Sequence, residues 1–159
     1  MKRGVVVAVL SLLCLILCSC ATERYSDSLG SAELAKHLTD EISGLENYAE
    51  YAEDDIELFA DAYDSCILYS KDADDQGEIG VIRAGSEQDA KGLLDEVNAY
   101  LERTRSERRT FVENYLPAES VKLNSARARR FGSYVIYAII ESERVSELFD
   151  AADKALRSQ

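Results

Sequence analysis

The chain is poor in the residues that build covalent cross-links and catalytic or metal centres. Its 159 residues include four cysteines, three of them within the first twenty positions, and a single histidine, His37. Because Cys66 is the only cysteine beyond position 20, an internal disulfide of the folded part is excluded, and folding must rest on burial of apolar surface. No serine or cysteine nucleophile is recognisably paired with His37, so we interpret it as a surface residue rather than a catalytic base.

Positive charge is scarce as well. Without Lys2 and Arg3, which belong to the N-terminal leader, the chain has 16 lysines and arginines against 30 aspartates and glutamates, a net charge of −14. Binding to nucleic acid depends on Lys and Arg neutralising phosphates, so this balance argues against non-specific nucleic-acid binding. The chain as a whole should also be repelled by an anionic membrane face.

Only one long apolar run is present, and it lies at the N-terminus. It spans residues 4–17, follows Lys2 and Arg3, and leads into Leu17-Cys18-Ser19-Cys20. Charge, apolar span and a small residue before cysteine, in this order, predict a secretory signal peptide over residues 1–19. The alternative is an uncleaved transmembrane helix, but that needs about 20 apolar residues, more than this run supplies.

The sequence Leu-x-Ser-Cys resembles the lipobox of bacterial lipoproteins. In those proteins a diacylglyceryl group is attached to the cysteine thiol, and cleavage leaves that cysteine as the new N-terminus. The resemblance implies that Cys20 is lipidated and anchors the protein to the extracytoplasmic face of the cell membrane. We expect residues 20–30 to be the lipidated cysteine and a tether of at most about 35 Å. Residues 31–159 are then long enough for a single domain with its own core.

Beyond the tether, helical and extended patterns follow one another. A helix is predicted from Ser31 and ends at Gly44, and one or two short helices are predicted over residues 45–63. Two apolar runs, 66–70 and 78–84, flank a polar segment and predict a β-hairpin with a long loop.

A long helix is predicted next, over residues 86–115, with Ser86 and Asp89 as a capping box and Pro117 after its end. It would be about 45 Å long, longer than any of the strands, so it must overhang the sheet or kink. The remaining predicted elements are two strands and a last helix, over residues 125–130, 134–140 and 143–156.

These elements predict an α+β fold. A helical lead-in is followed by the order ββαββα, which favours a two-layer sandwich with a four-stranded, mainly antiparallel sheet. Residues 134–140 are apolar on both faces, the pattern of a central strand or of one covered on both sides.

The second half of the chain resembles a known family. The resemblance rests on Arg103, Phe111-x-x-x-Tyr115-x-Pro117, Leu123, Ala126 and Gly132-x-Tyr134-Val135. These residues are similar to those of a family of bacterial lipoprotein domains, the Domain of Unknown Function family numbered four-three-five-eight, which is frequent in Clostridia-like Gram-positive bacteria. The resemblance covers residues 30–158 and implies an N-terminal lipoprotein signal. The family carries no assigned activity that could be transferred.

An acidic segment and a cysteine have structural explanations. Residues 72–77 have the Asp-x-Asp-x-x-Gly opening of a calcium loop, but the twelfth position, which needs a glutamate, is Arg83. We interpret the segment as an acidic hairpin turn and expect no metal site and no cofactor. Cys66 opens an apolar strand close to Asp61 and Asp64, so we expect an inert buried thiol. With 30 acidic residues, chance clusters of carboxylates are expected, and no catalytic residue is predicted.

Positive charge is concentrated in one segment. Residues 20–102 hold 5 basic and 22 acidic residues, whereas residues 103–130 hold 8 basic and 3 acidic ones. Arginine presents a bidentate fork to phosphate or carboxylate, which makes the second segment a candidate anion-binding patch. The candidate residues are Arg103, Arg108, Arg127, Arg129 and Arg130. The alternative is that these arginines pair with the acidic first half of the chain.

The sequence therefore predicts a membrane-anchored lipoprotein that acts as a non-enzymatic binding or interaction domain. Its expected partners are the membrane, through the lipid anchor, and an anionic envelope polymer or an acidic protein. An enzyme acting on envelope material and a structural accessory subunit of a membrane complex are the alternatives. A pocket with converging polar groups and perturbed carboxylates would favour the enzyme.

Overall fold

The computed structural model describes residues 25–50 and 63–157. In chain order the described elements are α2 (Ser31–Glu41), β1 (Tyr48–Glu50), β2 (Asp64–Ser70), β3 (Glu78–Arg83), α3 (Asp89–Tyr115), α4 (Pro117–Ser125), β4 (Arg127–Phe131), β5 (Tyr134–Ile139) and α5 (Ser142–Arg157). The predicted α+β class is confirmed, and so is the order ββαββα, to which the structure adds α4.

The strands form one antiparallel sheet in the order β1-β2-β3-β5-β4. In the β2–β3 hairpin Cys66 lies opposite Val81, and Leu68 lies opposite Ile79. β5 lies between β3 and β4, and all of its residues are buried. The predicted hairpin and the predicted central strand are thereby confirmed.

The sheet has five strands rather than the four predicted. Residues 48–50, predicted to be helical, form the short edge strand β1, in which Tyr48 lies opposite Ser70 and Glu50 lies opposite Leu68. Three residues are too few to show a period, so pairing with the edge of β2 decides their conformation. Residues 51–62 of the same prediction lie outside the described residues.

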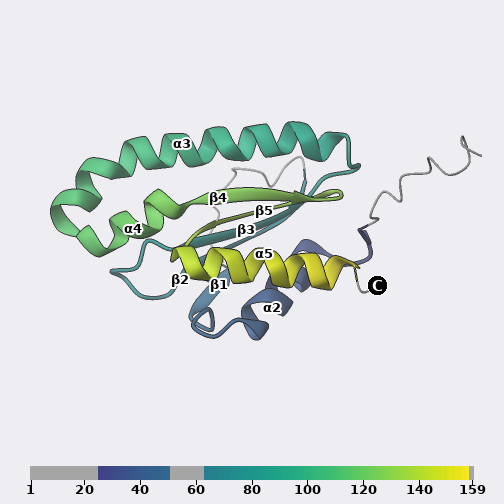
Figure 1. Cartoon of the computed structure of the whole chain (residues 1–159), viewed down its shortest axis with the longest axis horizontal. Coiled ribbons are helices and arrows are strands. Elements are labelled where there is room, and N and C mark those ends of the chain that lie inside the picture. The colour runs from purple at the N-terminus through teal and green to yellow at the C-terminus, as the bar shows by residue number, and fades with distance from the viewer. Residues whose placement is uncertain (1–24, 51–62, 158–159) are drawn as a thin grey trace, which may run out of the picture.

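Helices cover both faces of the sheet, so the fold has three layers rather than the two predicted (Figure 1). α2 and α5 pack on one face through Leu38 and Leu148, and α3 packs on the other through Leu93 and Val97. The apolar stripe of a helix shows which side of the helix is buried, but not which face of the sheet it covers. Which face a helix covers depends instead on the direction in which the connections between helix and strands cross the sheet.

α3 has 27 residues and is about 40 Å long. At its start the hydroxyl of Ser86 accepts a hydrogen bond from the Asp89 N–H at 3.1 Å and donates to the Asp89 carboxylate at 2.7 Å. α3 ends at Tyr115, and Pro117 opens α4, which leads back to β4 (Figure 1). Of the two outcomes predicted for this helix, an overhang or a kink, the structure shows the overhang, because α3 extends past the end of the sheet (Figure 1). No helix in the two described ranges has both the length and the apolarity to cross a membrane.

Residues 25–29, predicted to belong to the tether, pack on the domain. The Tyr25 ring lies edge-on to Phe131, with centroids 5.9 Å apart, and its hydroxyl donates to Asp153 at 2.7 Å. The Ser26 N–H donates to the carbonyl of Leu156 at 2.9 Å. The polar composition of the segment suggested a free linker, but many of its contacts are made by backbone groups, which composition does not reveal.

Candidate functional site

The sheet-facing stripe of α3 continues past the end of the sheet. The stripe consists of residues spaced three or four apart, namely Leu93, Val97, Leu101, Thr104, Arg108, Phe111 and Tyr115. Thr104 is still buried, whereas Phe111 is 53% and Tyr115 is 72% exposed. Their rings lie side by side, with centroids 5.3 Å apart. We call residues 105–121, which include the end of α3 and the first half of α4, the overhang.

Exposed apolar side chains are concentrated on the overhang. Within the described ranges the exposed large apolar residues are Phe111, Tyr115 and Val121, and all three belong to it. Val112, by contrast, is buried in the core on this side of the sheet, which also includes Leu123. The overhang is therefore a packed helical corner that carries exposed apolar side chains, and not a frayed helix end.

A cavity of about 400 Å³ lies where the overhang meets the loop between β2 and β3. Tyr69 and the loop line most of it, and Arg108 of α3 completes the lining. Lys71, Asp72 and Gln76 place charged and amide groups around it. Both donors and acceptors therefore face this space, one helical turn from the exposed aromatic pair.

Arg108 lies beside a buried carboxylate. Glu78, the first residue of β3, is fully buried, and its Oε1 accepts hydrogen bonds from the hydroxyls of Tyr100 and Tyr137, both at 2.6 Å. Glu78 Oε2 accepts no hydrogen bond from the described residues and lies 3.6 Å from Arg108 Nη2. Burial and the charge of Glu78 raise the pKa of both tyrosines, so they remain protonated donors at neutral pH. The charge of Glu78 thus holds Arg108 at the cavity.

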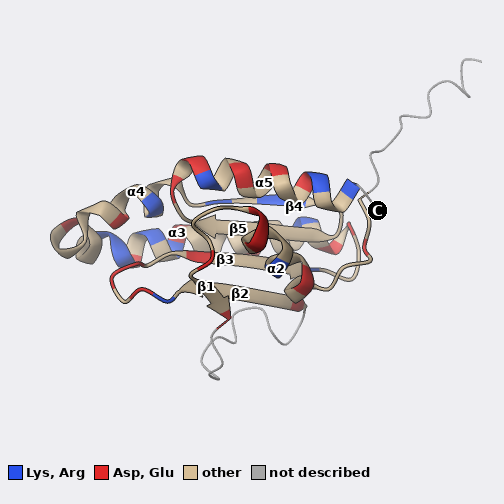
Figure 2. Cartoon of the chain, turned by 90° about the horizontal axis from the view of Figure 1, so that it is seen from below, with Lys and Arg blue, Asp and Glu red and all other residues tan. Residues whose placement is uncertain are grey.

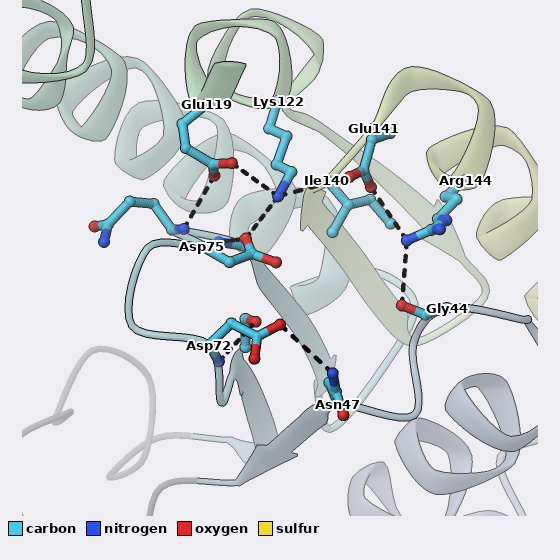
Figure 3. Close-up of polar contacts among 12 residues, drawn as sticks. Gly44, Asn47, Asp72, Asp75, Glu119, Lys122, Ile140, Glu141 and Arg144 are labelled. Carbon is cyan, nitrogen blue, oxygen red and sulfur yellow. Dashed lines mark hydrogen bonds and ion pairs between the residues drawn. The ribbon is translucent and has the colours of Figure 1, made fainter. Parts of the chain in front are cut away.

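An ion cluster around Lys122 holds the loop to the overhang (Figure 3). The Lys122 side chain is 11% exposed, and its ammonium lies 2.7 Å from Asp75, 3.0 Å from Glu119 and 3.6 Å from Glu141. Glu119 also accepts a hydrogen bond from the Gln76 N–H at 3.0 Å. The loop, α4 and the connection between β5 and α5 therefore share one cation, which fixes the loop wall of the cavity.

Removing this cation should destabilise the domain. We expect Lys122→Met to lower the free energy of unfolding by about 2 kcal/mol, because it leaves several half-buried carboxylates without their counter-charge. Lys36→Met is the control, because Lys36 pairs with Asp40 on the surface at 2.5 Å and both side chains are more than half exposed. Urea unfolding of the two variants measures the difference, and equal losses would contradict a special role for Lys122.

The same cluster should make stability depend on acidity. Burial raises the pKa of Asp75, but hydrogen bonds from Lys122 and from the Gly77 N–H outweigh it, so the net shift is downward. An acid whose pKa is lowered by folding stabilises the fold above its ordinary pKa, and this contribution is lost as the pH falls through the folded value. The wild type should therefore lose stability below about pH 4, and Lys122→Met should lose less. Melting temperatures at pH 7 and pH 3 test this.

The arginines of β4 point to two faces of the sheet. Arg129 lies opposite Ile136, which belongs to the core under α2 and α5, and Arg127 shares that face. Arg130 lies opposite Val135, which belongs to the core under α3. The structure therefore brings Arg127 and Arg129 together and places Arg130 on the other face.

The other two candidate arginines lie on α3. The Arg103 guanidinium is 5.9 Å from the centre of the Tyr100 ring, and Arg108 lies between Glu78 and the cavity. The five candidates thus do not share one surface. Internal pairing, the alternative, applies to Arg108.

Other residues singled out from the sequence have plain surroundings. Cys66 is buried as predicted, and burial raises the pKa of its thiol to about 11. The His37 ring lies on the surface, 3.5 Å from Glu41. In the acidic loop the Asp75 N–H donates a hydrogen bond to the carbonyl of Asp72, as in a tight turn. The described residues contain no group of three or more His, Cys, Asp or Glu placed to hold a metal ion. Cys20 lies outside the described residues.

Sequence reasoning did not find Glu78, Tyr100 and Lys122. A charged residue heading an otherwise apolar strand was the available signal for Glu78, and the Glu119 and Lys122 spacing was the signal for the ion cluster. Neither signal identifies the distant partners, which are Tyr100 and Tyr137 for Glu78 and Asp75 for Lys122, because these lie far away in the chain.

No family model, no curated protein and no solved structure matches this chain. The resemblance to the lipoprotein domain family stays a prediction, and function has to be inferred from the geometry.

Proposed function

We propose that the protein is a lipoprotein anchored through Cys20 to the extracytoplasmic face of the cell membrane, with a non-enzymatic binding domain whose binding surface is the overhang. The observation that carries the binding role is the exposed pair Phe111 and Tyr115. A helical stripe that is buried for most of its length ends there in two aromatic side chains beyond the sheet. Contiguous exposed apolar side chains are typical of interaction surfaces.

The chemistry of the overhang favours an acidic protein segment as the partner. Aromatic residues and arginine are enriched at the centres of protein interfaces. Arg108 and Glu78 are 3.6 Å apart, too far for a hydrogen bond, so the Arg108 fork can receive a carboxylate at the cavity. The expected partner segment places apolar side chains on the aromatic pair and a carboxylate on Arg108.

The overhang lies at the end of the molecule opposite to the entry of the chain. Tyr25 packs beside Phe131 at the β4–β5 turn, whereas the cavity adjoins the β2–β3 loop at the other end of the same strands. α3 is about 40 Å long and runs between these ends (Figure 1). A lipid anchor at Cys20 would therefore leave the overhang accessible.

Photo-crosslinking in intact cells tests the binding surface. A benzoylphenylalanine placed at Lys71, on the rim of the cavity, should give a discrete crosslinked protein product. The change Phe111→Ser with Tyr115→Ser should abolish this product without lowering the melting temperature, because both side chains are exposed. The control is Arg109→Ser with Glu113→Ser, which alters the same stretch of helix at constant net charge and should keep the product. Loss in both double variants, or in neither, would contradict the proposal.

The anchor has its own test. Cys20→Ala should release the protein from membranes or leave it as an unprocessed precursor, because stable anchoring needs two acyl chains and the diacylglyceryl group supplies them. Cell fractionation with detection of precursor and mature sizes measures this. A Cys20→Ala protein that is processed and still membrane-bound would show that the lipobox interpretation is wrong.

A further inference from the structure

The chain enters the domain through a rigid segment. The carbonyls of Asp27 and Leu29 accept hydrogen bonds from Arg83 at 3.0 and 3.1 Å, and that of Leu29 also accepts one from the Tyr134 hydroxyl at 2.6 Å. Gly132, which has a φ of +59°, leaves room for the Tyr25 side chain. Residues 25–29 are therefore fixed to the end of the sheet that carries the β4–β5 turn.

This entry point limits the distance between the domain and a lipid on Cys20. Tyr25 is five positions after Cys20, and a fully extended chain over five such steps reaches at most about 18 Å. The end of the sheet with the β4–β5 turn must therefore stay close to the membrane that holds the lipid.

β4 next to this turn is a basic edge strand. Its sequence is Arg-Ala-Arg-Arg-Phe, and it forms one edge of the sheet (Figure 2). Arg127, Arg129 and Arg130 form no ion pair with a carboxylate in the described part of the chain. Asp153, whose pKa Arg129 helps to lower, already accepts hydrogen bonds from Arg157 and Tyr25. Arg130 donates one hydrogen bond to the Gly132 carbonyl and Arg129 lies over the Phe131 ring, and neither contact neutralises the positive charge, so the cations of β4 can still attract an external anion.

The opposite edge of the sheet has the opposite sign. β1 and β2 hold Glu50 and Asp64 and no lysine or arginine. A domain with net negative charge can approach an anionic surface only if its basic side faces that surface, since charges farther away are screened over about 10 Å at 0.1 M salt.

We propose that the β4 edge rests on anionic phospholipid headgroups of the membrane that holds Cys20. The proposal rests on the anchoring proposed above. Arg127 and Arg129 lie on one side of the edge and Arg130 on the other, so the three flank the strand and suit a flat anionic surface rather than a pocket. Each lysine or arginine near such a surface strengthens binding about five-fold, so three of them contribute roughly 100-fold. The acidic edge then points away from the membrane, which gives the domain one orientation.

Fluorescence of the full chain, purified from membranes and reconstituted in vesicles, tests this orientation. The chain has no tryptophan, so Asn124→Trp, just before β4, and Glu50→Trp, on the far edge, are clean reporters. In phosphatidylglycerol vesicles with a headgroup quencher, Trp at 124 should be quenched several-fold more than Trp at 50. In phosphatidylcholine vesicles, or at 0.5 M salt, the difference should disappear.

Substitution of the edge arginines decides the cause. Changing Arg127, Arg129 and Arg130 to Ser should equalise the two reporters, whereas changing Lys71, Lys91 and Arg109 to Ser, with the same loss of charge on exposed sites, should not. The proposal would be overturned if the two reporters were quenched equally in protein that keeps its edge arginines. It would also be overturned if the difference in quenching persisted after Arg127, Arg129 and Arg130 were changed to Ser.

The anchor is tested separately by flotation with phosphatidylcholine vesicles, in which both triple variants should float. If they do not float, the anchoring proposal fails. In that case flotation with phosphatidylglycerol vesicles still tests the β4 edge. The unmodified protein should float with these vesicles, and the Arg127, Arg129 and Arg130 variant should not.

Discussion

Ile136→Asp is expected to leave the domain unfolded at room temperature. Ile136 is completely buried, with 0% exposure. It lies in β5 between β3 and β4, opposite Val81 and Arg129. An aspartate there would place a carboxylate in the apolar core under α2 and α5, where the neighbouring cation is Arg129, whose guanidinium lies over the Phe131 ring. Such a burial costs several kcal/mol, against a total stability of about 5–15 kcal/mol for a typical domain.

The matched control for this change is Val121→Asp. It also replaces a branched apolar residue by aspartate, but Val121 is 61% exposed on the overhang. Its expected effect on the free energy of unfolding is below about 1 kcal/mol. Far-ultraviolet circular dichroism and urea unfolding separate the two variants. A folded Ile136→Asp protein with near wild-type stability would mean that the position of β5 in the sheet is wrong.

Gly80→Ala is expected to destabilise the domain by about 3 kcal/mol and to lower the melting temperature by about 10 °C. Gly80 lies in β3 opposite Tyr137. A Cβ atom at Gly80 would fall on the Tyr137 ring, which is fully buried and cannot move away freely. The absent side chain lets the ring lie across β3 and reach the carboxylate of Glu78 at 2.6 Å. The added methyl group should therefore strain the core and break that hydrogen bond.

Two further variants show whether the Tyr137 ring is the cause. Gly92→Ala, the same substitution on the exposed side of α3 with no atom within 4 Å of the new Cβ, should stabilise the domain by about 0.5–1 kcal/mol. In a Tyr137→Ala background, Gly80→Ala should cost much less than in the wild type, because the clashing ring is absent. Equal costs of Gly80→Ala in the two backgrounds would show that the clash with Tyr137 is not the reason.

Gly80 also connects the core to the proposed binding surface. Tyr137 and Tyr100 hold the Glu78 carboxylate, and that carboxylate holds Arg108 at the cavity. A change at Gly80 small enough to leave the domain folded should therefore also disturb Arg108. The crosslink from Lys71 is expected to weaken in Gly80→Ala even where the protein is still folded.

Much of the secondary structure was predictable from local patterns. The apolar runs of β2, β3 and β5, the Ser86 and Asp89 pair and the stop at Pro117 each depend on residues close together in the chain. Propensity, capping and hydrophobic period act over such short distances, so the sequence shows them directly. β1 was predicted wrongly because its extended form depends on pairing with β2, about twenty residues away in the chain.

The candidate site was less predictable. Arg108 was predicted as a candidate anion-binding residue, and the structure explains its position by Glu78, which lies on another element. Five arginines clustered in the sequence suggested one patch. Side-chain alternation along β4 and the separate position of α3 divide them between surfaces.

By itself, the sequence determined the α+β class, the great length of α3 relative to the strands and the acidic character of the chain, because these follow from composition, length and short-range periodicity. Only the tertiary structure decided that helices cover both faces of the sheet, that Tyr25 is docked beside Phe131, and that Lys122 joins three segments of the chain. These features depend on contacts between residues far apart in the chain. No local pattern encodes such contacts, since they exist only once the sheet has brought its strands and connections together.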